Sequence, residues 1–572
     1  MPLLPILTII LPLLGAGGIL GLSLVPRMRP YTRYIALTTA SLTTILLLAF
    51  RWMEPVTVIP SLWQPSLLFG AVPTLQTDVT MLPLALALAL ITCSAMLVAL
   101  GRAEEPHPRL AATLLALLST GFVALWAANP LTTIISWAFY DLLQAAGCIA
   151  AGGSVRTAIR GLVFGNVATL LLWGGTLLSD GGAGSELWSL MTPSDVQLTL
   201  WMVAGVLRLW VYPLHLSAPD DIGTTPSLAA SLLLGPVVGW GLWLRLAQVN
   251  GGSIPSGTWV LTLAAISLAV GGFLAWSCSD PRRTLPWVGM GVNGAALLAT
   301  GLAGDNAIVL ITAGSMTWAL GTALLFLSEG LQRRALWWSI PALVEALALI
   351  GVPFTLGFMT EAPLIEGLTR ESRLEWGVAF VVGYLFLLPS LVRGLPLTPP
   401  RSGEGSLTSL HEEGGRRVRS AARGASARAL SRAIGLGLPA LLLIVAGLYP
   451  PLLIRGVPTP SLGSLFALPG LMGWLLWAVA LAGGGVLVWQ ERTLRPRIKL
   501  FLSAAHDLLR LEWLYGTVVG ALDRGLSVLR VADEVVGGAG ALLWSWLLFL
   551  LLLLVFSASS FAGLSLPQSP VP

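Results

Sequence analysis

Charge is scarce in this chain. Only 10% of its 572 residues are Asp, Glu, Lys or Arg, while 55% are hydrophobic. Because a soluble globular domain carries about 25% charged residues, this balance excludes a large soluble domain. Apolar runs of about 18 or more residues, with Gly and Pro inside them, recur along the sequence. The composition therefore predicts an integral membrane protein that lies in the lipid bilayer and has no nucleic-acid partner.

Lysine and cysteine are almost missing. Lys499 is the only lysine, so nearly every positive side chain is Arg, which does not give up its proton in proteins. The cysteines Cys93, Cys148 and Cys278 are far apart and form no CxxC or Cys/His pattern. No Walker A loop is present, and the glycines within 15–18 lie in an apolar run, which favours close helix packing. We therefore expect no metal, no bound cofactor and no catalytic residue of its own.

The apolar runs predict an all-α polytopic membrane protein with about sixteen transmembrane helices. The first run follows no basic segment and precedes no small-residue cleavage site, so we expect a first membrane helix instead of a signal peptide. The predicted helices span residues 3–25, 32–51, 78–101, 108–128, 130–151, 157–178, 197–216, 225–248, 256–276, 284–303, 306–328, 336–369, 373–395, 432–455, 464–489 and 537–557.

Five regions follow from this pattern, with an inverted repeat formed by helices four to eight and nine to thirteen. Near 498–535, apolar residues alternate with Arg and Asp, which predicts an amphipathic helix on the membrane surface or a helical hairpin against the protein. The regions are 1–107 with the N-terminal helices, 108–250 with the first repeat, 251–395 with the second repeat, 396–431 as a basic, mobile cytoplasmic loop, and 432–572 with the C-terminal helices and the amphipathic segment.

Arginine placement predicts the orientation, since loops rich in Arg and Lys stay on the cytoplasmic side. When the connecting loops are numbered from the one that follows the first predicted helix, the odd-numbered loops are basic. The even-numbered loops are mostly short, neutral or acidic. The prediction is a multi-pass protein of a prokaryotic plasma (inner) membrane with both termini outside. The basic loops hold Arg27, Arg29 and Arg33, then Arg102 and Arg109, Arg156 and Arg160, Arg282 and Arg283, and Arg333 and Arg334; Arg370, Arg373 and Arg455 are exceptions.

Two of the predicted helices are interrupted. The seventh runs into Tyr212-Pro213-Leu214-His215, and the twelfth contains Gly351-Val352-Pro353 and then Gly357. Proline removes a backbone donor and opens a helix. Broken helices at corresponding positions of two halves indicate an ion path in transporters, while the simpler interpretation of each is an ordinary proline kink.

Ionisable residues at mid-membrane depth are costly and so predict function. Asp141 lies about eleven residues into its helix, or roughly mid-bilayer at ~1.5 Å per residue, and Arg208 lies at similar depth. We expect the two to form an ion pair, which either serves transport or only pins two helices together. His215 follows the first break and either shuttles protons or holds a structural hydrogen bond.

Two carboxylates flank the second break. Glu345 lies about ten residues into the twelfth helix, and Glu361 lies just beyond the opening. Carboxyl groups around an opened helix suit proton binding. The alternative for Glu361 is an interfacial residue that caps the second half-helix. The predicted proton path thus comprises Asp141, Arg208, His215, Glu345 and Glu361.

At the two breaks the sequence resembles the antiporter-like membrane subunits of respiratory complex I, which are related to multisubunit cation/proton antiporters and membrane-bound hydrogenase subunits. The first motif is Arg208, then Pro213-Leu214-His215, Pro219-Asp220 and Thr225-Pro226, with one residue missing before Thr225. The second is Gly351-x-Pro353, then Phe358 and Glu361. Asp141 and Asp78 also correspond to acidic positions of the family. The resemblance covers roughly 1–490.

The departures from the family concern its proton wire. Arg208 replaces a lysine, and Leu232, Val238, Trp318 and Thr322 stand where the family has His and Lys. Either water and the remaining carboxylates carry protons, or this subunit translocates little.

The resemblance implies a proton-translocating subunit of an NADH:quinone oxidoreductase-type complex, with a partly degenerate proton path. Its partners would be other membrane subunits of a respiratory or antiporter complex, and protons or another cation. It would be a subunit without a redox site of its own, so redox chemistry would lie in other subunits. The alternatives are a structural scaffold whose channel is silent, and a component of a multisubunit cation/proton antiporter.

The orientation gives the first testable prediction. Protease added to sealed right-side-out vesicles should leave the 396–431 loop intact, because its arginines keep it in the cytoplasm. Fragment masses report the cut sites, and inside-out vesicles serve as the control in which the loop is accessible. Cleavage within 396–431 in right-side-out vesicles would reverse the predicted orientation.

Overall fold

The structure, a computed structural model, contains two compact units, Met1–Lys499 and Leu500–Pro572. The larger unit holds both broken helices. The residues that the structure describes are 3–52, 55–59, 72–178, 187–218, 226–254, 257–278, 281–302, 304–328, 339–371, 373–395, 415–454, 470–537 and 549–551.

The first part of the larger unit consists of α-helices joined by short 3₁₀ turns and one small antiparallel pairing. The pairing joins β1 (Thr57–Val58) to β2 (Leu75–Gln76), with Thr57 opposite Gln76. The helices are α1 (Leu3–Ser23), α2 (Thr32–Ala49), α4 (Leu82–Gly101), α5 (Pro108–Leu125), α6 (Pro130–Ala150), α7 (Val155–Leu177), α8 (Asp195–Arg208) and α9 (Gly235–Val249), with 3₁₀ turns η1 (Pro26–Tyr31), η2 (Phe50–Trp52), η3 (Trp188–Leu190), η4 (His215–Ser217) and η5 (Ser227–Leu234).

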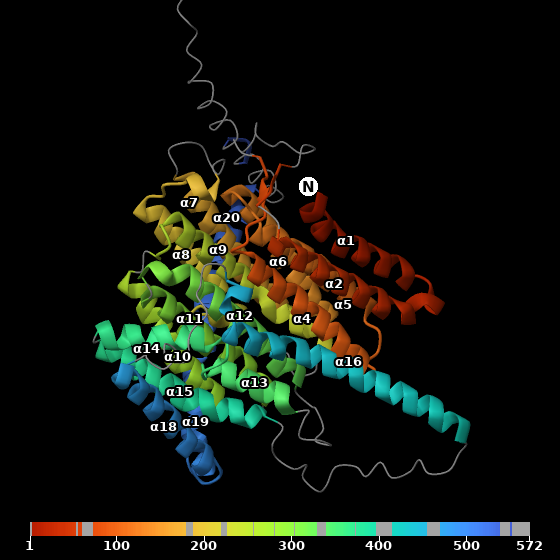
Figure 1. The fold of residues 1–572 in the computed structure, drawn as a ribbon. Coiled ribbons are helices and arrows are strands. Elements are labelled where there is room, and N and C mark those ends of the chain that lie inside the picture. Colours follow the sequence, from red (N-terminus) through yellow and green to blue (C-terminus); the bar gives the residue numbers. More distant parts are fainter. Residues whose placement is uncertain are drawn as a thin grey trace, which may run out of the picture. The chain divides into compact units, whose positions relative to one another are not determined.

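The second part is helical as well. Its helices are α10 (Thr258–Ser277), α11 (Leu285–Leu302), α12 (Ala307–Ser328), α13 (Ile340–Leu349), α14 (Phe358–Glu371), α15 (Leu374–Gly394), α16 (Gly415–Leu448) and α18 (Gly470–Arg497), with 3₁₀ turns η6 (Pro281–Thr284), η7 (Gly304–Asn306) and η9 (Pro450–Leu452). Figure 1 shows α10, α14 and α15 close together, and α10 packs against both α11 and α15.

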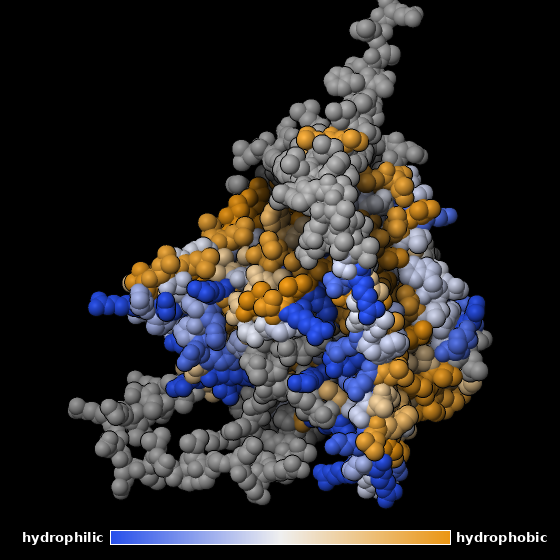
Figure 2. Space-filling model, turned by 180° about the vertical axis from the view of Figure 1, so that it is seen from behind, coloured by the Kyte–Doolittle hydropathy of each residue, from blue (hydrophilic) through white to orange (hydrophobic). Residues whose placement is uncertain are grey.

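The helical architecture confirms the predicted all-α polytopic class. In the described part of the chain, 13 segments are long and apolar enough to cross a membrane. Figure 2 shows wide hydrophobic areas on the surface, as expected where helices face lipid. Exposed apolar residues include Phe139 and Leu142 on α6 and Val163 and Leu170 on α7. The helix expected at 537–557 lies largely outside the described residues, so the predicted helix number and the inverted repeat stay predictions.

Helix α16 differs from the sequence-based expectation. It begins at Gly415, so residues 415–431, predicted as part of a loop, are helical. The stretch is rich in Ala and Arg, both good helix formers, which explains why a polar segment continues the membrane helix. Figure 1 shows α16 as one long helix, and it packs against α4 and α12.

Four segments form the buried centre of the larger unit: α4, η5 with α9, α11, and α12. Small residues let their neighbours approach closely, as is usual between membrane helices. A Cβ atom added at Gly294 of α11 would lie 2.6 Å from the backbone nitrogen of Leu268 on α10. The centre is therefore assembled by direct backbone contact between helices.

Both predicted breaks are confirmed. Helix α8 ends at Arg208, and regular helix resumes only after η4 and η5, while α13 ends at Leu349 and α14 begins at Phe358. In the second break Gly351 has a φ of 75°, which glycine adopts without strain. A Cβ atom at Gly357 would overlap the carbonyl oxygen of Ala348, so the two half-helices touch at this point.

The smaller unit contains α19 (Lys499–Leu509) and α20 (Glu512–Gly537). The predicted amphipathic segment at 498–535 is thus helical, with a turn at Leu511, whose φ is 58°. Leu500 and Phe501 of α19 and Trp513 of α20 are exposed apolar residues. Its placement on the membrane surface stays a prediction.

The contact at Gly357 yields a stability prediction. Gly357→Ala should destabilise the protein by about 1–3 kcal/mol, because the added methyl group overlaps the Ala348 carbonyl and pushes the half-helices apart. Gly437→Ala, within α16 and with open space around its Cβ position, is the matched control and should be neutral or slightly stabilising. Thermal unfolding in detergent measures both; equal behaviour of the two variants would contradict the prediction.

Candidate functional site

The first break contains the predicted ion pair. Two guanidinium nitrogens of Arg208, on α8, donate to the two carboxylate oxygens of Asp141, on α6: Nη1 to Oδ1 at 2.8 Å and Nη2 to Oδ2 at 2.6 Å. Both side chains are buried. This bidentate geometry is the strongest form of an Arg–carboxylate contact. The predicted pairing of Asp141 with Arg208 is therefore confirmed.

The pair is held from several sides. Arg208 Nη2 also lies 3.2 Å from the Thr169 hydroxyl and 3.3 Å from the Gly165 carbonyl, both on α7. The Trp137 ring stacks under the guanidinium, with 3.9 Å from Cζ to the ring centroid. Gly165 lies directly against the Asp141 carboxylate, where a side chain would overlap it. The surroundings thus leave both charges little freedom to move.

His215 lies in η4, just after the break. Its ring stacks on Tyr212 at 5.5 Å between centroids and contacts Trp287 at 5.2 Å. Its Nδ1 lies 3.1 Å from the carbonyl oxygen of Pro213. Aromatic rings therefore enclose this histidine. Pro219, Asp220 and Thr225 of the same motif lie outside the described residues.

The second break contains the two carboxylates that the sequence singled out. Glu345, on α13, is fully buried, and Glu361, in the first turn of α14, is 4% exposed. Neither oxygen of Glu345, nor Oε2 of Glu361, has a hydrogen-bond partner among the described residues. Glu361 packs directly against Gly351. Unlike Asp141, these carboxylates face no arginine in any of the described ion pairs.

Glu361 occupies the amino-terminal end of α14, where the helix dipole interacts favourably with a negative charge. This placement agrees with the alternative in which Glu361 caps the second half-helix. The two roles are compatible, since a carboxylate at a helix end can bind a proton as well.

Tryptophan and asparagine fill the region between the breaks. Trp210 and Trp318 meet edge to face at 5.5 Å, and Trp318 Nε1 donates to the Gly289 carbonyl at 2.9 Å. Asn293 donates to the Leu209 carbonyl at 2.7 Å, at the end of α8, and accepts from Trp240 at 3.0 Å. Trp318 and Thr322, two of the residues that the resemblance aligns with His and Lys, are thus buried and bonded to backbone carbonyls, Thr322 to that of Trp318.

A second buried arginine, Arg245 of α9, was missed by the sequence reasoning. It lies 3.5 Å from Asp78, and Gln248 donates to the same carboxylate at 2.7 Å. Burial alone would raise the pKa of Asp78, but hydrogen bonds from Thr80 and Gln248 and the charge of Arg245 outweigh it and lower the pKa. The feature of the sequence that could have revealed this pair is Arg245 itself, a single arginine within an otherwise apolar run.

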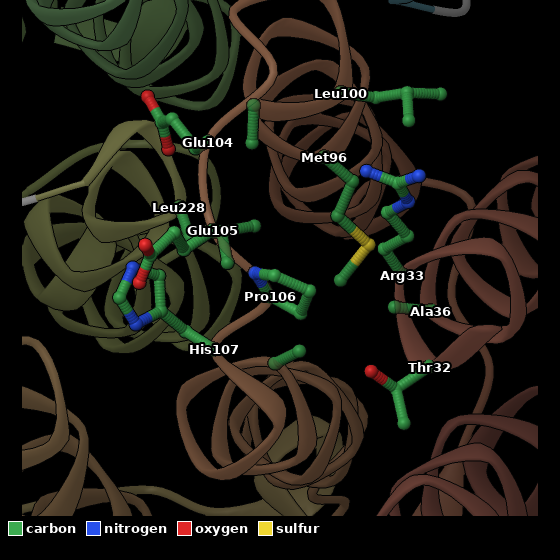
Figure 3. Close-up of a pocket in the computed structure, with 12 residues that line it drawn as sticks. Thr32, Arg33, Ala36, Met96, Leu100, Glu104, Glu105, Pro106, His107 and Leu228 are labelled. Atoms are coloured by element: carbon green, nitrogen blue, oxygen red, sulfur yellow. The ribbon is translucent and has the colours of Figure 1, made fainter. Parts of the chain in front are cut away.

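The loop between α4 and α5 was missed as well. Glu104 accepts hydrogen bonds from the backbone nitrogen of Ser227, at 3.0 and 3.2 Å, and so caps η5. Figure 3 shows Glu104, Glu105 and His107 around a small pocket beside Arg33. Its volume of about 30 Å³ suits a water molecule or two.

The ion pair yields the next prediction. Asp141→Asn should destabilise the protein by about 3–5 kcal/mol, because it leaves a buried guanidinium without its counter-charge. Adding Arg208→Gln should partly restore stability, because the unpaired charge is then removed. Thermal unfolding and the yield of assembled protein measure both effects.

Glu375→Gln is the matched control, since it breaks the exposed pair with Arg373 and should change stability by about 0–1 kcal/mol. A double variant no better than Asp141→Asn alone would argue against mutual dependence of the two charges.

Comparison with known proteins places this geometry in a wider context. No protein-family model matches the chain. It is 26% identical over 327 residues to the NADH-quinone oxidoreductase subunit N of Mycobacterium sp. (strain JLS), a match that covers 51% of this chain and 70% of that protein.

Three solved structures are similar to it, each at 18% sequence identity. A chain of the membrane-bound sulfane sulfur reductase, an archaeal respiratory membrane complex, has a TM-score of 0.68 over 96% of this chain and 99% of that chain. A chain of the Mrp complex from Dietzia sp. DQ12-45-1b has a TM-score of 0.69 over 99% of this chain and 64% of that chain. A chain of respiratory complex I from Thermus thermophilus has a TM-score of 0.55 over 76% of this chain and 98% of that chain. The resemblance inferred from the two breaks is therefore confirmed, and the chain has the fold of the antiporter-like membrane subunits of respiratory and antiporter complexes.

Proposed function

We propose that this chain is a proton-translocating, antiporter-like membrane subunit of an NADH:quinone oxidoreductase-type complex. The observation that carries the proposal is the pair of buried carboxylates, Glu345 and Glu361, at a helix break without a described counter-charge. A buried carboxylate without a cation is too costly to keep as a bare charge. Such a group changes its charge only together with a small cation, of which the proton is the simplest.

Glu361 is the proposed central carrier. It lies at the opening between α13 and α14, where backbone groups are released from the helix and the chain can move. Glu345, in α13, is the proposed relay on the other side of the break. A proton on one carboxylate neutralises it, and transfer to the other moves charge across the middle of the bundle.

Asp141, Arg208 and His215 complete the proposed path in the first half. Arg208 keeps its proton, so its part is to set the electric field that neighbouring acids experience. Asp141 is tied to Arg208 by two hydrogen bonds, and a change of its charge must act through that pair. His215, which contacts the rings of Tyr212 and Trp287, is the proposed proton shuttle of this half.

The likeness to membrane subunits of larger complexes supports partner subunits in the same membrane. The proposed partners include subunits that carry redox cofactors and deliver the energy for transport. The proposed location is a prokaryotic plasma membrane, with both termini outside, as the arginine-rich loops indicate. The proposed transported ion is H⁺, with Na⁺ as the alternative cation.

A scaffold with a silent channel is a second candidate. The packed pair Trp210 and Trp318 favours it, because these side chains fill the region between the two halves. The third candidate, a subunit of a cation/proton antiporter, is favoured by the likeness to the Mrp chain over 99% of this chain. Identification of the subunits that co-purify with the native chain separates redox complex from antiporter.

The test of proton transport uses Glu361→Gln. Glutamine keeps the size of the side chain and removes the exchangeable proton, so the complex should assemble while transport falls by at least about tenfold. Proton uptake per electron, followed with a pH-sensitive dye in vesicles that contain the native complex, is the measurement. Glu366→Gln, on an exposed position of the same helix, is the control and should transport normally.

Unchanged proton uptake per electron in Glu361→Gln would favour the scaffold. If the unchanged chain instead transports Na⁺, and Glu361→Gln abolishes that Na⁺ transport, the ion carried at Glu361 is Na⁺ and not the proton.

A further inference from the structure

The hydroxyl groups in α12, the second break and α14 hydrogen-bond to backbone carbonyls close by in the sequence, except for two. Most of them donate to a carbonyl of their own helix or turn, three or four residues earlier: Thr312 to Ile308, Thr322 to Trp318, Thr355 to Val352 and Thr369 to Ile365. The hydroxyls of Thr317 and Thr360 are buried and have no partner among the described residues. Such back-bonding is the default for threonine in a helix, so its failure at two neighbouring positions needs a cause.

These two threonines lie on facing helices beside the second break. A Cβ atom at Gly357 would lie 3.2 Å from Cγ2 of Thr317, on α12, and one at Gly314, a turn before Thr317, would lie 3.4 Å from Cγ2 of Thr360. Thr360 immediately precedes Glu361, and both backbone nitrogens donate to the Gly357 carbonyl at 3.0 Å. Thr317, Thr360 and Glu361 are therefore grouped where α12, α14 and the break meet.

Unpartnered polar atoms occur on three elements around the second break, among the described residues. They are the hydroxyl of Thr317 on α12, the hydroxyl of Thr360 and the Oε2 atom of Glu361 on α14, and both oxygens of Glu345 on α13. A buried polar group without a partner is unfavourable, and lipid supplies none. Water is the small molecule that both donates and accepts, and buried water typically binds two to four otherwise unsatisfied polar groups.

We propose that Thr317 and Thr360 bind the ordered water through which Glu361 exchanges its proton. The inference rests on the proposed function, in which Glu361 carries protons. The carboxyl proton passes to the bound water, and that water releases one of its own protons to the next acceptor, so no bond is left unbalanced. Each hydroxyl orients the water by one hydrogen bond and itself exchanges no net proton, which makes both threonines positioning residues.

Glu345 is the proposed next acceptor. It is the other buried carboxylate at the break, it lies on the half-helix that ends at Leu349, and Glu361 packs against Gly351 just beyond that end. Bound water can carry the proton from one carboxylate to the other.

The test compares threonine, valine and serine. Thr317→Val and Thr360→Val remove the hydroxyl and nearly keep the shape, while Thr317→Ser and Thr360→Ser keep the hydroxyl. Thr322→Val is the matched control, because that hydroxyl lies on the same buried helix and is already bonded to the Trp318 carbonyl. All variants are studied in the native complex in sealed vesicles, with proton uptake per electron as the first readout.

The Val/Val double variant should lower proton uptake per electron about tenfold, as expected when hydrogen bonds that position the transferred proton are lost. Each Ser variant and Thr322→Val should stay close to the unchanged protein. The second readout is the infrared band of the protonated Glu361 carboxyl, identified by its disappearance in Glu361→Gln. It should shift to higher wavenumber in Thr360→Val, because the carboxyl loses its bound water, and return in Thr360→Ser.

Normal transport by both Val variants, while Glu361→Gln is inactive, would overturn this inference and leave the proposed function standing. Normal transport by Glu361→Gln itself would overturn the proposed function instead. Serine variants that fail as badly as the valine variants would show that side-chain shape matters and not the hydroxyl. If the double variant does not assemble, the infrared shift in the single variants decides the question.

Discussion

Polar groups inside a membrane protein must find their partners within the protein, because lipid offers none. This constraint governs the described structure wherever it buries a charge. Around Arg208 it is met almost completely: two hydrogen bonds reach Asp141, a third contact reaches Thr169, and the Trp137 ring covers the cation. The first break is therefore fixed in place by a network of hydrogen bonds around one buried cation.

The guanidinium explains why this break differs from one built around lysine. Arginine offers five donors in a rigid planar fork, which suits a carboxylate held bidentately and leaves donors for the neighbouring helix. An ammonium group has a compact charge that exchanges protons more readily when buried. With Arg208 in that position, two hydrogen bonds fix the geometry of the pair with Asp141. The basic member of the pair, however, cannot release a proton.

The second break differs, because the described residues do not meet this constraint there. Glu345 and Glu361 have no described arginine partner, and the hydroxyls of Thr317 and Thr360 have no hydrogen-bond partner among the described residues. Between the two breaks, Asn293 satisfies the carbonyl that α8 releases at Leu209, and Trp318 bonds to Gly289. The described structure therefore holds a closed ion pair at one break and, at the other, two buried carboxylates without a described ion-pair partner.

Local patterns in the sequence predict much of this. Hydropathy marks nearly all of the membrane helices, Gly and Pro mark both breaks, and equal depth in the bilayer leads to the pairing of Asp141 with Arg208. The start of α16 at Gly415 and the pairing of Arg245 with Asp78 do not follow from the sequence in this way. The first depends on how far a polar helix can continue beyond the membrane, and the second on which ends of distant helices meet.

The free hydroxyls of Thr317 and Thr360 are likewise decided by tertiary structure. In sequence they resemble Thr312 and Thr322, which bond to their own helix. Whether a threonine bonds to its own helix depends on the neighbour that lies across from it, which is the second break for Thr317 and α12 for Thr360. Periodicity and propensity act along one helix, whereas the partners of buried polar groups are set by the contact between helices.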